Sequence, residues 1–244
     1  MYKKGDFIIE SNEALCQGVY RMLLRGDTQY ITSAGQFVNI LLEGKYLRRP
    51  ISVCDVEPGL LTIVYKVFGD GTRQMSEMSA GESLNLLSGL GNGFSLDNSA
   101  TAPLLVGGGV GIPPLYNLAK RLLLKGVKPT ILLGFNTASQ AFMVDDFTAL
   151  GVDVVVTTAD GSLGIKGLIT AALPDIDFDY TYSCGPIPML KALSDATTCL
   201  GEFSFEERMG CGFGACVGCT CKTKYGNKRI CKEGPVLKKE EIIW

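Results

Sequence analysis

Four cysteines near the C-terminus constrain this chain more than any other feature. Cys211, Cys216 and Cys219 share one glycine-rich loop, and Cys231 follows farther along the chain. The spacing C-x4-C-x2-C…C is the plant-type ligand pattern of a [2Fe–2S] cluster. Because such a cluster passes one electron at a time, the spacing predicts a protein that relays electrons.

Two alternatives remain open for this loop. A structural zinc site usually pairs two short C-x2-C hooks across a longer loop, whereas here three cysteines share one tight loop, so the spacing favours iron–sulfur over zinc. Cys221 competes with Cys231 for the fourth ligand position, because Cys219 and Cys221 point to the same face of an extended segment. Since the plant-type pattern takes its fourth ligand from farther along the chain, we assign Cys231 and interpret Cys221 as a buried bystander.

The composition excludes several other classes of protein. Nine cysteines and no histidine rule out Ser-His and Cys-His nucleophiles, His-bound zinc and Rieske centres. An odd number of cysteines without a secretion signal argues against a disulfide framework, so we expect reduced or metal-bound cysteines in the cytoplasm. A net charge of −2 predicts no binding to nucleic acid. No apolar run reaches the roughly 18 residues of a membrane span.

Residues 1–98 are predicted to form an antiparallel β-barrel. Short apolar and β-branched runs such as DFIIE, GQFVNILLEG and LLTIVYKVFG recur between Gly, Asn, Asp and Pro. Many short strands with frequent turns are typical of a barrel or a sandwich. We expect only one helical segment here, around residues 72–78.

The pattern changes after a linker at residues 95–103. In residues 99–206, strands such as PLLVG, PTILLGF and VDVVVTT alternate with helices expected at 113–125, 145–150, 166–173 and 188–198. This alternation predicts a doubly wound α/β domain with a parallel sheet. Residues 207–244 are rich in glycine and cysteine and too short to bury a core, so we expect a third, small module that the metal orders.

Three further motifs are candidates for cofactor binding. The segment Gly107–Gly111 follows a strand and opens a helix, the context in which backbone N–H groups bind nucleotide phosphates, with a simple tight turn as the alternative. Cys184-Gly-Pro ends a predicted parallel strand, where ligands of open sheets bind, and a plain strand-to-helix turn explains it equally well. Arginine and serine at residues 48–52 are phosphate and flavin binders by chemistry, although a solvated arginine pair is the commoner outcome.

Together these motifs resemble the ferredoxin–NADP reductase superfamily. With the short cysteine module, in particular the loop ERMGCGFGACVGC, the chain is similar over essentially its whole length to the electron-transfer subunits of type B dihydroorotate dehydrogenases. The resemblance implies FAD in the barrel, NAD(H) on the α/β domain and no catalytic side chain, with Cys184 near the nicotinamide. It implies FAD contacts at Arg49, Pro50, Ile51, Ser52, Val64, Tyr65, Lys66, Gly71 and Thr72, NAD contacts at Gly107, Gly108, Gly109, Val110, Gly111, Cys184, Gly185 and Pro186, and cluster ligands at Cys211, Cys216, Cys219 and Cys231.

The resemblance also implies a partner and a reaction. An FMN-containing catalytic subunit would oxidise dihydroorotate to orotate in pyrimidine biosynthesis, and two relay subunits would assemble with two catalytic ones. Nothing in this chain is recognisable as a dihydroorotate site, so a hydrogenase-like, sulfide-reducing or bifurcating complex remains an alternative partner. A zinc-stabilised nucleotide-binding module without redox activity is the alternative of another class.

The expected nicotinamide is NADH. The 2′-phosphate of NADPH needs arginine or lysine beyond the second strand of the sheet. Residues 134–146 contain neither and end in Asp145 and Asp146, and after the third strand only Lys166 is basic.

Overall fold

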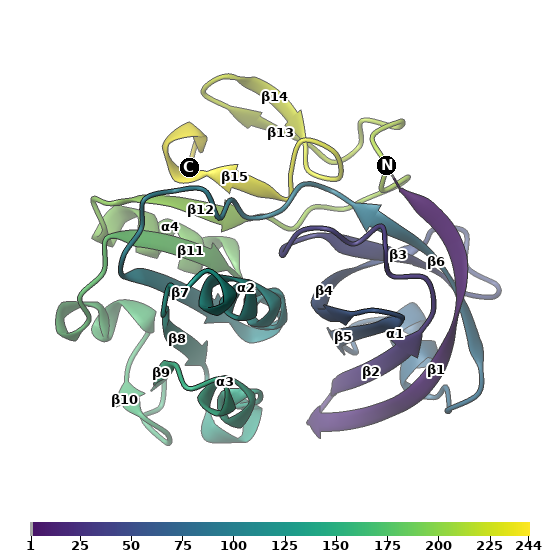
Figure 1. Cartoon of the computed structure of the whole chain (residues 1–244), viewed down its shortest axis with the longest axis horizontal. Coiled ribbons are helices and arrows are strands. Elements are labelled where there is room, and N and C mark those ends of the chain that lie inside the picture. Colours follow the sequence, from purple (N-terminus) through teal and green to yellow (C-terminus); the bar gives the residue numbers. More distant parts are fainter. Residues whose placement is uncertain (1) are drawn as a thin grey trace.

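Strands in the first part of the chain close into a six-stranded antiparallel barrel in the computed structural model, which describes residues 2–244 (Figure 1). Side chains of alternating residues fill its interior, among them Val38 and Ile40 on β3, which are fully buried. The predicted barrel is therefore confirmed. Its strands, in the closing order β1-β2-β5-β4-β3-β6, are β1 (Lys3–Cys16), β2 (Val19–Arg25), β5 (Leu60–Lys66), β4 (Arg49–Glu57), β3 (Phe37–Leu41) and β6 (Ser83–Leu90), with helix α1 (Asp70–Ser76) between β5 and β6.

A doubly wound α/β domain follows the barrel, as the alternating pattern predicts. The sheet order is β10-β9-β8-β7-β11-β12-β15, and every pairing is parallel except the last. The elements of this domain are β7 (Pro103–Gly108), the 3-10 turn η1 (Gly109–Gly111), α2 (Pro113–Leu124), β8 (Thr130–Phe135), η2 (Ala138–Gln140), α3 (Val144–Ala149), β9 (Asp153–Thr158), β10 (Ile165–Lys166), β11 (Tyr180–Cys184), α4 (Ile187–Ala196) and β12 (Leu200–Ser204).

The prediction of a helix at residues 166–173 is wrong. This part of the chain forms the short strand β10 and then two 3-10 turns, η3 (Ile169–Ala171) and η4 (Leu173–Asp175). Gly164 and Gly167 adopt positive φ values of 66° and 129°, which lie outside the helical region. Pro174 then ends any continuous helical hydrogen bonding.

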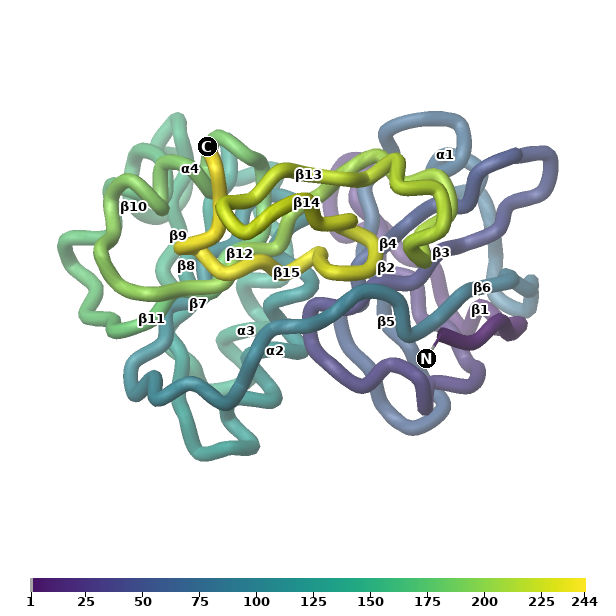
Figure 2. Tube along the Cα trace, turned by 90° about the horizontal axis from the view of Figure 1, so that it is seen from above, coloured from purple at the N-terminus to yellow at the C-terminus, as the bar shows by residue number. Residues whose placement is uncertain are grey.

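The C-terminal segment lies across the junction of the two domains (Figure 2). It forms a hairpin, β13 (Thr220–Thr223) with β14 (Gly226–Arg229), then β15 (Val236–Lys238) and η5 (Lys239–Glu241). β15 pairs antiparallel with β12, so the cysteine segment contributes an edge strand to the α/β sheet. With three residues, β15 is too short to show any periodicity in the sequence.

The barrel and the α/β domain share a continuous core. Val64 of the barrel packs in one buried cluster with Leu115 and Phe147 of the second domain. Polar contacts add to this junction: the Lys120 ammonium lies 2.5 Å from the Asp55 carboxylate, at the face where α2 covers β4. The strand that begins with Arg49 is therefore held firmly against the nucleotide-binding domain.

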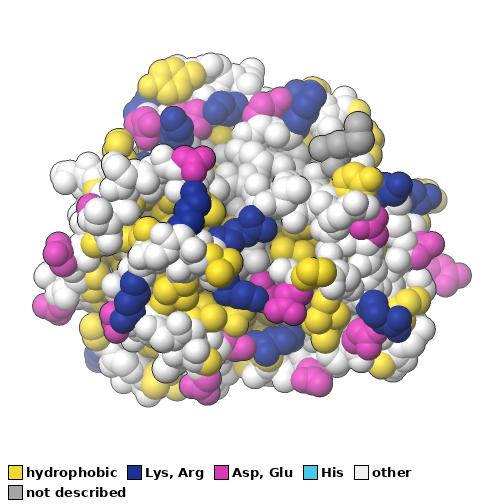
Figure 3. Space-filling view, in the orientation of Figure 1, with side chains coloured by type: hydrophobic (Ala, Val, Ile, Leu, Met, Phe, Trp, Pro, Cys, Tyr) yellow, Lys and Arg dark blue, Asp and Glu magenta, His cyan; other side chains and the backbone are white. Residues whose placement is uncertain are grey.

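The surface carries both charge signs side by side (Figure 3), which agrees with the low net charge. Within residues 2–244, no helix is long and apolar enough to cross a membrane.

Candidate cofactor sites

The cysteine loop has a buried side and an open side. Cys219 and Cys231 are each 2% exposed and pack with Phe37 of β3 and Ile230 in one apolar cluster. Cys216 is exposed. This arrangement suits a group that is shielded by the protein on one side and accessible to a redox partner on the other.

The four predicted ligands are arranged as two pairs. The backbone N–H of Cys216 donates to Cys211 Sγ over 3.4 Å, and the N–H of Cys231 donates to Cys219 Sγ over 3.4 Å. A two-iron cluster needs four thiolates, two for each iron, so this donor set fits it. Within the part of the chain that the structure describes, no three such side chains are drawn together tightly enough to hold a metal ion.

Local hydrogen bonds prepare the first cysteine for metal binding. Burial opposes ionisation of Cys211, but N–H groups of Cys216, Phe213 and Ala215 point at its sulfur and lower the pKa of the thiol to about 6. Burial and the neighbouring thiols of Cys219 and Cys211 raise the pKa of Cys231 to about 12. Since the thiolate is the form that binds metal, the lowered pKa of Cys211 suits it to be a metal ligand.

Cys221 lies in a different environment. It stands on β13 opposite Lys228 of β14 and is half-buried. Burial and then the Glu207 carboxylate raise the pKa of its thiol, and its other charged neighbours are Glu241 and Lys228. Cys221 packs against the same apolar cluster as Cys219 and Cys231, but charged side chains dominate among its neighbours, whereas the thiols of Cys219 and Cys211 act on Cys231. These surroundings support Cys231 as the fourth ligand.

The two arginines at the start of β4 turn in opposite directions. Arg49 lies over the first turn of α1, where a β-carbon on Gly71 would stand 2.8 Å from the guanidinium carbon. Arg48 instead donates to the backbone oxygens of Asn39 and Asn85, both over 3.0 Å. The pair is therefore not a solvated one: Arg48 ties strands together, and Arg49 faces the Gly71–Thr72 turn that we expect to hold the FAD pyrophosphate.

The three predicted flavin residues on β5 do not share one face. Val64 points into the interdomain core and Lys66 is exposed, whereas the Tyr65 ring is 2% exposed and packs with the core of the barrel. The Tyr65 hydroxyl donates to Asn12 Oδ1 over 2.9 Å. Only the backbone of Tyr65 is free to contact a flavin on the face that Val64 occupies.

Two glycine motifs that are distant in sequence meet at the carboxyl ends of β7 and β11. The parallel register places Cys184 beside Gly107. A β-carbon on Gly111 would lie 2.5 Å from the amide nitrogen of Gly185, and one on Gly185 would lie 3.2 Å from the nitrogen of Gly108. β7 is also where the strand order reverses, which is where open α/β sheets bind ligands.

Cys184 is not an activated nucleophile in this arrangement. Burial raises the pKa of its thiol to about 12, which the Ser204 hydroxyl only partly offsets by hydrogen bonding. The thiol is therefore neutral at physiological pH. We expect Cys184 to contribute shape beside the nicotinamide rather than covalent chemistry.

Comparison with known proteins agrees with this geometry. Residues 206–243 match the family model of the iron–sulfur cluster binding domain of dihydroorotate dehydrogenase B. The electron transfer subunit of dihydroorotate dehydrogenase B (NAD(+)) from Bacillus pumilus is 42% identical, with 98% of each chain covered, and the one from Fusobacterium nucleatum subsp. nucleatum is 41% identical with the same coverage. This chain belongs to the family of dihydroorotate dehydrogenase B electron-transfer subunits.

Solved structures place the family in its fold superfamily. An NADH-dependent reduced ferredoxin–NADP oxidoreductase, described in connection with flavin-based electron bifurcation, matches 98% of this chain and 90% of its own with a TM-score of 0.89 at 32% identity. A ferredoxin–NADP+ reductase from Neisseria gonorrhoeae with bound FAD and NADP matches 80% of this chain and 90% of its own with a TM-score of 0.70 at 18% identity. The second likeness concerns the fold alone.

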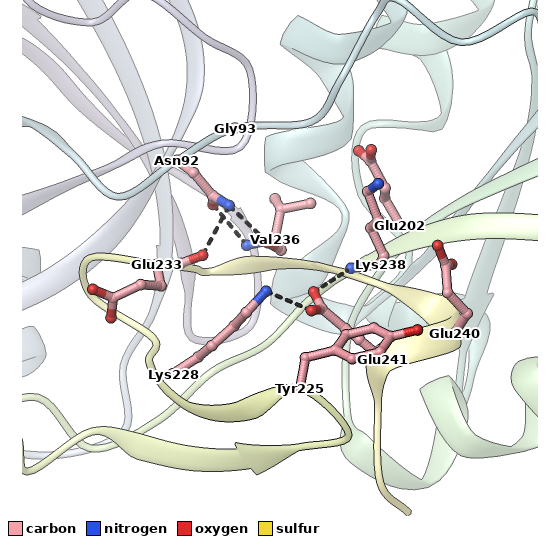
Figure 4. A pocket seen from close by; sticks show the side chains of 10 residues that line it. All are labelled: Asn92, Gly93, Glu202, Tyr225, Lys228, Glu233, Val236, Lys238, Glu240 and Glu241. Carbon is pink, nitrogen blue, oxygen red and sulfur yellow. Dashed lines mark hydrogen bonds and ion pairs between the residues drawn. The ribbon is translucent and has the colours of Figure 1, made fainter.

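A groove of about 440 Å³ lies away from all three predicted cofactor sites, between the C-terminal segment and the edge of the α/β sheet (Figure 4). Asn92 closes one end through a 2.7 Å hydrogen bond from its amide to Val236 O. Lys228 forms an ion pair with Glu241, which also accepts from the Lys238 N–H over 2.9 Å. Because the charged groups bind one another inside the C-terminal module, they are not free to bind a ligand, and Asn92 connects the module to the first domain.

Sequence reasoning overlooked Asn39 on β3. Its amide nitrogen donates to the carbonyl oxygen of Cys211 over 3.2 Å, so a barrel strand contacts the first predicted cluster ligand directly. The only signal in the sequence is one polar residue inside the apolar run FVNILL.

Proposed function

We propose that this chain carries electrons between a dihydroorotate-oxidising partner and NAD+, by way of a [2Fe–2S] cluster and FAD. The observation that carries the proposal is the position of the cysteine loop. It rests on β3, the direct neighbour of the strand that holds the predicted FAD residues Arg49–Ser52. β4 in turn packs against the first helix of the nucleotide-binding domain. The three predicted cofactor sites therefore follow one another through adjacent elements.

Each part of the chain has a separate task. FAD supplies the link between two-electron exchange with nicotinamide and one-electron exchange with the cluster. Arg49 and the Gly71–Thr72 turn would neutralise and orient the FAD pyrophosphate. Gly107–Gly111 and Cys184–Pro186 meet at the carboxyl edge of the sheet, where their backbone would bind the dinucleotide. Cys211, Cys216, Cys219 and Cys231 would hold the cluster.

The nicotinamide cofactor is NAD(H) rather than NADP(H). The loop after β8 contains no arginine or lysine for a 2′-phosphate. At the end of the neighbouring strand β9, the Ser162 hydroxyl donates to the Asp160 carboxylate over 2.6 Å and the Ser162 N–H donates to it over 3.0 Å. These two bonds keep the pKa of Asp160 low. A fixed negative charge at this edge disfavours a phosphate there.

The partner is the catalytic subunit of a dihydroorotate dehydrogenase. We expect FMN in that subunit, an assembly of two relay and two catalytic subunits, and a cytoplasmic location that keeps the cysteines reduced. The exposed Cys216 side of the loop provides the surface on which such a partner would approach the cluster.

Purification under anaerobic conditions tests the proposal. The purified chain should show flavin and cluster absorption. It should contain about one FAD and about two iron atoms per protein molecule. Co-expressed with a catalytic subunit, it should support NAD+-dependent orotate formation. A colourless, zinc-containing protein contradicts the proposal and supports the nucleotide-binding module without redox activity.

A bifurcating complex is the second candidate for the partner. It is supported by the 32% identity and the TM-score of 0.89 to the bifurcating oxidoreductase. The identity of 42% to a dihydroorotate dehydrogenase subunit is higher at equal coverage of this chain, and favours the first assignment. Co-purification separates the two: isolation of this chain only with a subunit that does not oxidise dihydroorotate contradicts the pyrimidine assignment.

A further inference from the structure

The side chain of Asn39 joins the barrel to the cysteine loop. Its Nδ2 donates to the carbonyl oxygen of Cys211 over 3.2 Å. Within residues 2–244, this is the only hydrogen bond between the barrel and the loop at 211–219, whose other bonds stay inside the C-terminal module. Asn39 is 1% exposed, so water does not compete for the bond.

The strand register places Asn39 among the predicted flavin contacts. Phe37 and Asn39 face the C-terminal module, whereas Val38 between them points into the barrel. On the neighbouring strand β4, Pro50 stands opposite Asn39 and Ser52 stands opposite Phe37. Opposite residues in an antiparallel pair share a face with their β-carbons about 5 Å apart, and diagonal neighbours lie about 7–8 Å apart. One face of the β3–β4 pair thus carries both the predicted flavin contacts Pro50 and Ser52 and the loop contact Asn39.

Asn39 has little freedom to move. Arg48 donates to its backbone oxygen and to that of Asn85, each over 3.0 Å, which fixes β3 against its neighbours. On the other side, Gly212 has a φ of 79°, and a β-carbon there would overlap the Asn39 amide nitrogen. The close approach of the loop to this side chain therefore requires glycine at position 212.

We propose that Asn39 is a positioning residue for electron transfer between the flavin and the cluster, an inference that rests on the proposed function. Its amide holds the Cys211 segment against the strand pair that carries the flavin contacts, and so sets the spacing between the two sites. Asn39 Oδ1 is buried without a partner among the described residues. The Asn39 carboxamide therefore contacts the loop through a single donor bond. Apolar contacts of Phe37 with Cys219 and of the Tyr2 ring with Phe213 also hold the loop, so loss of the bond loosens the loop around Cys211 rather than detaching it.

Substitution of the carboxamide tests the role. Asn39→Leu keeps the branched shape and the number of heavy atoms of the side chain and removes the donor. Asn92→Leu is the matched control, because the Asn92 amide binds the module at Glu233 O (3.1 Å) and Val236 O (2.7 Å), away from the loop. The measurements, on the cofactor-loaded chain, are hydrogen exchange of residues 210–219, the EPR spectrum of the reduced cluster, and the rate at which NADH-reduced flavin reduces the cluster.

In Asn39→Leu, the amides of the loop should undergo hydrogen exchange about fivefold faster than in the wild type, as expected for the loss of one hydrogen bond. The EPR spectrum of this variant should change and its cluster reduction should slow, at unchanged iron content. Asn92→Leu should lower the melting temperature and leave the loop exchange and the EPR spectrum as in the wild type.

Wild-type exchange, EPR spectrum and transfer rate in Asn39→Leu would overturn the inference. If that variant does not retain the cluster, the smaller Asn39→Ala, which also lacks a donor, is measured in the same way, and wild-type values there overturn the inference equally. A wild-type chain that contains neither flavin nor iron contradicts the proposed function itself, which separates that failure from a failure of the Asn39 role.

Discussion

A β-carbon on Gly111 would overlap the carbonyl group of Cys184. The two residues lie in separate motifs, one after β7 and one at the end of β11, and the parallel register brings these motifs together. The absence of a side chain at Gly111 is what allows the two loops to close against each other at the carboxyl edge of the sheet. The packing of the two predicted NAD-binding motifs thus depends on glycine at position 111.

Gly111→Ala should therefore impair NADH binding. The added methyl group meets backbone, which cannot rotate away as a side chain can, so one of the loops must shift. We expect at least a tenfold rise in the Kd for NADH, measured by titration of the oxidised protein with a non-reducing NADH analogue. Gly126→Ala is the control, because Gly126 follows α2 outside the predicted NAD contacts and a β-carbon there meets nothing within 4 Å. Its positive φ of 78° makes the substitution cost about 1–2 kcal/mol of stability. Equal NADH affinity in Gly111→Ala and the wild type would show that the two motifs are not the nucleotide site.

Cys231→Ser and Cys221→Ser should behave differently. Cys231 lies beside Cys219, whereas Cys221 has Glu207, Glu241 and Lys228 around it. Cys231→Ser should lose most of the cluster absorption and iron, while Cys221→Ser should keep both. The visible spectrum and iron content of the two purified variants check this assignment, and the reverse pattern would move the fourth ligand to Cys221.

Arg49→Ala should weaken the retention of FAD without unfolding the barrel. The Arg49 guanidinium lies over Gly71, where we expect the pyrophosphate, so its loss removes a charge-assisted contact. The FAD-to-protein ratio after gel filtration measures the effect. Arg48→Ala is the matched control. It removes the hydrogen bonds that Arg48 donates to the backbone oxygens of Asn39 and Asn85 and, over 2.8 Å, to the side chain of Asn85. This variant should chiefly lower the free energy of unfolding, by about 1–3 kcal/mol. Full FAD occupancy in Arg49→Ala would contradict the flavin site.

Glu202→Gln should stabilise the chain at neutral pH. Burial raises the pKa of Glu202 above its usual value of 4.5, even though the Ser95 N–H donates to it over 2.8 Å. A raised carboxyl pKa means that the folded state binds more protons than the unfolded state, so the stability from this group is present below pH 4.5 and is lost as the pH rises through the folded-state pKa. Thermal melts should show a higher Tm for Glu202→Gln at pH 7, with a difference that shrinks towards pH 4. A lower Tm at pH 7 would show that the ionised carboxylate is net favourable.

Strand and helix patterns predicted most of the fold because they depend on local periodicity. The barrel strands alternate between core and surface, and α2 presents Leu115, Leu118 and Leu122 to one buried face. Failures occurred where local signals are weak. The expected helix at residues 166–173 is replaced by 3-10 turns, because Gly164 and Gly167 adopt positive φ values. β15 forms a strand only because it pairs with the edge strand β12.

By itself, the sequence determined the order of the two domains and predicted the kind of site at each motif: cysteine spacing for a cluster and glycines for a dinucleotide. Side-chain direction was decided only by tertiary structure. Arg48 and Arg49 are adjacent in sequence, yet one bonds to β3 and the other lies over α1. Asn39 is one polar residue in an apolar strand until the C-terminal module covers it. The physical reason is that a side chain's role depends on which strand or loop packs against its face, and those neighbours come from distant parts of the chain.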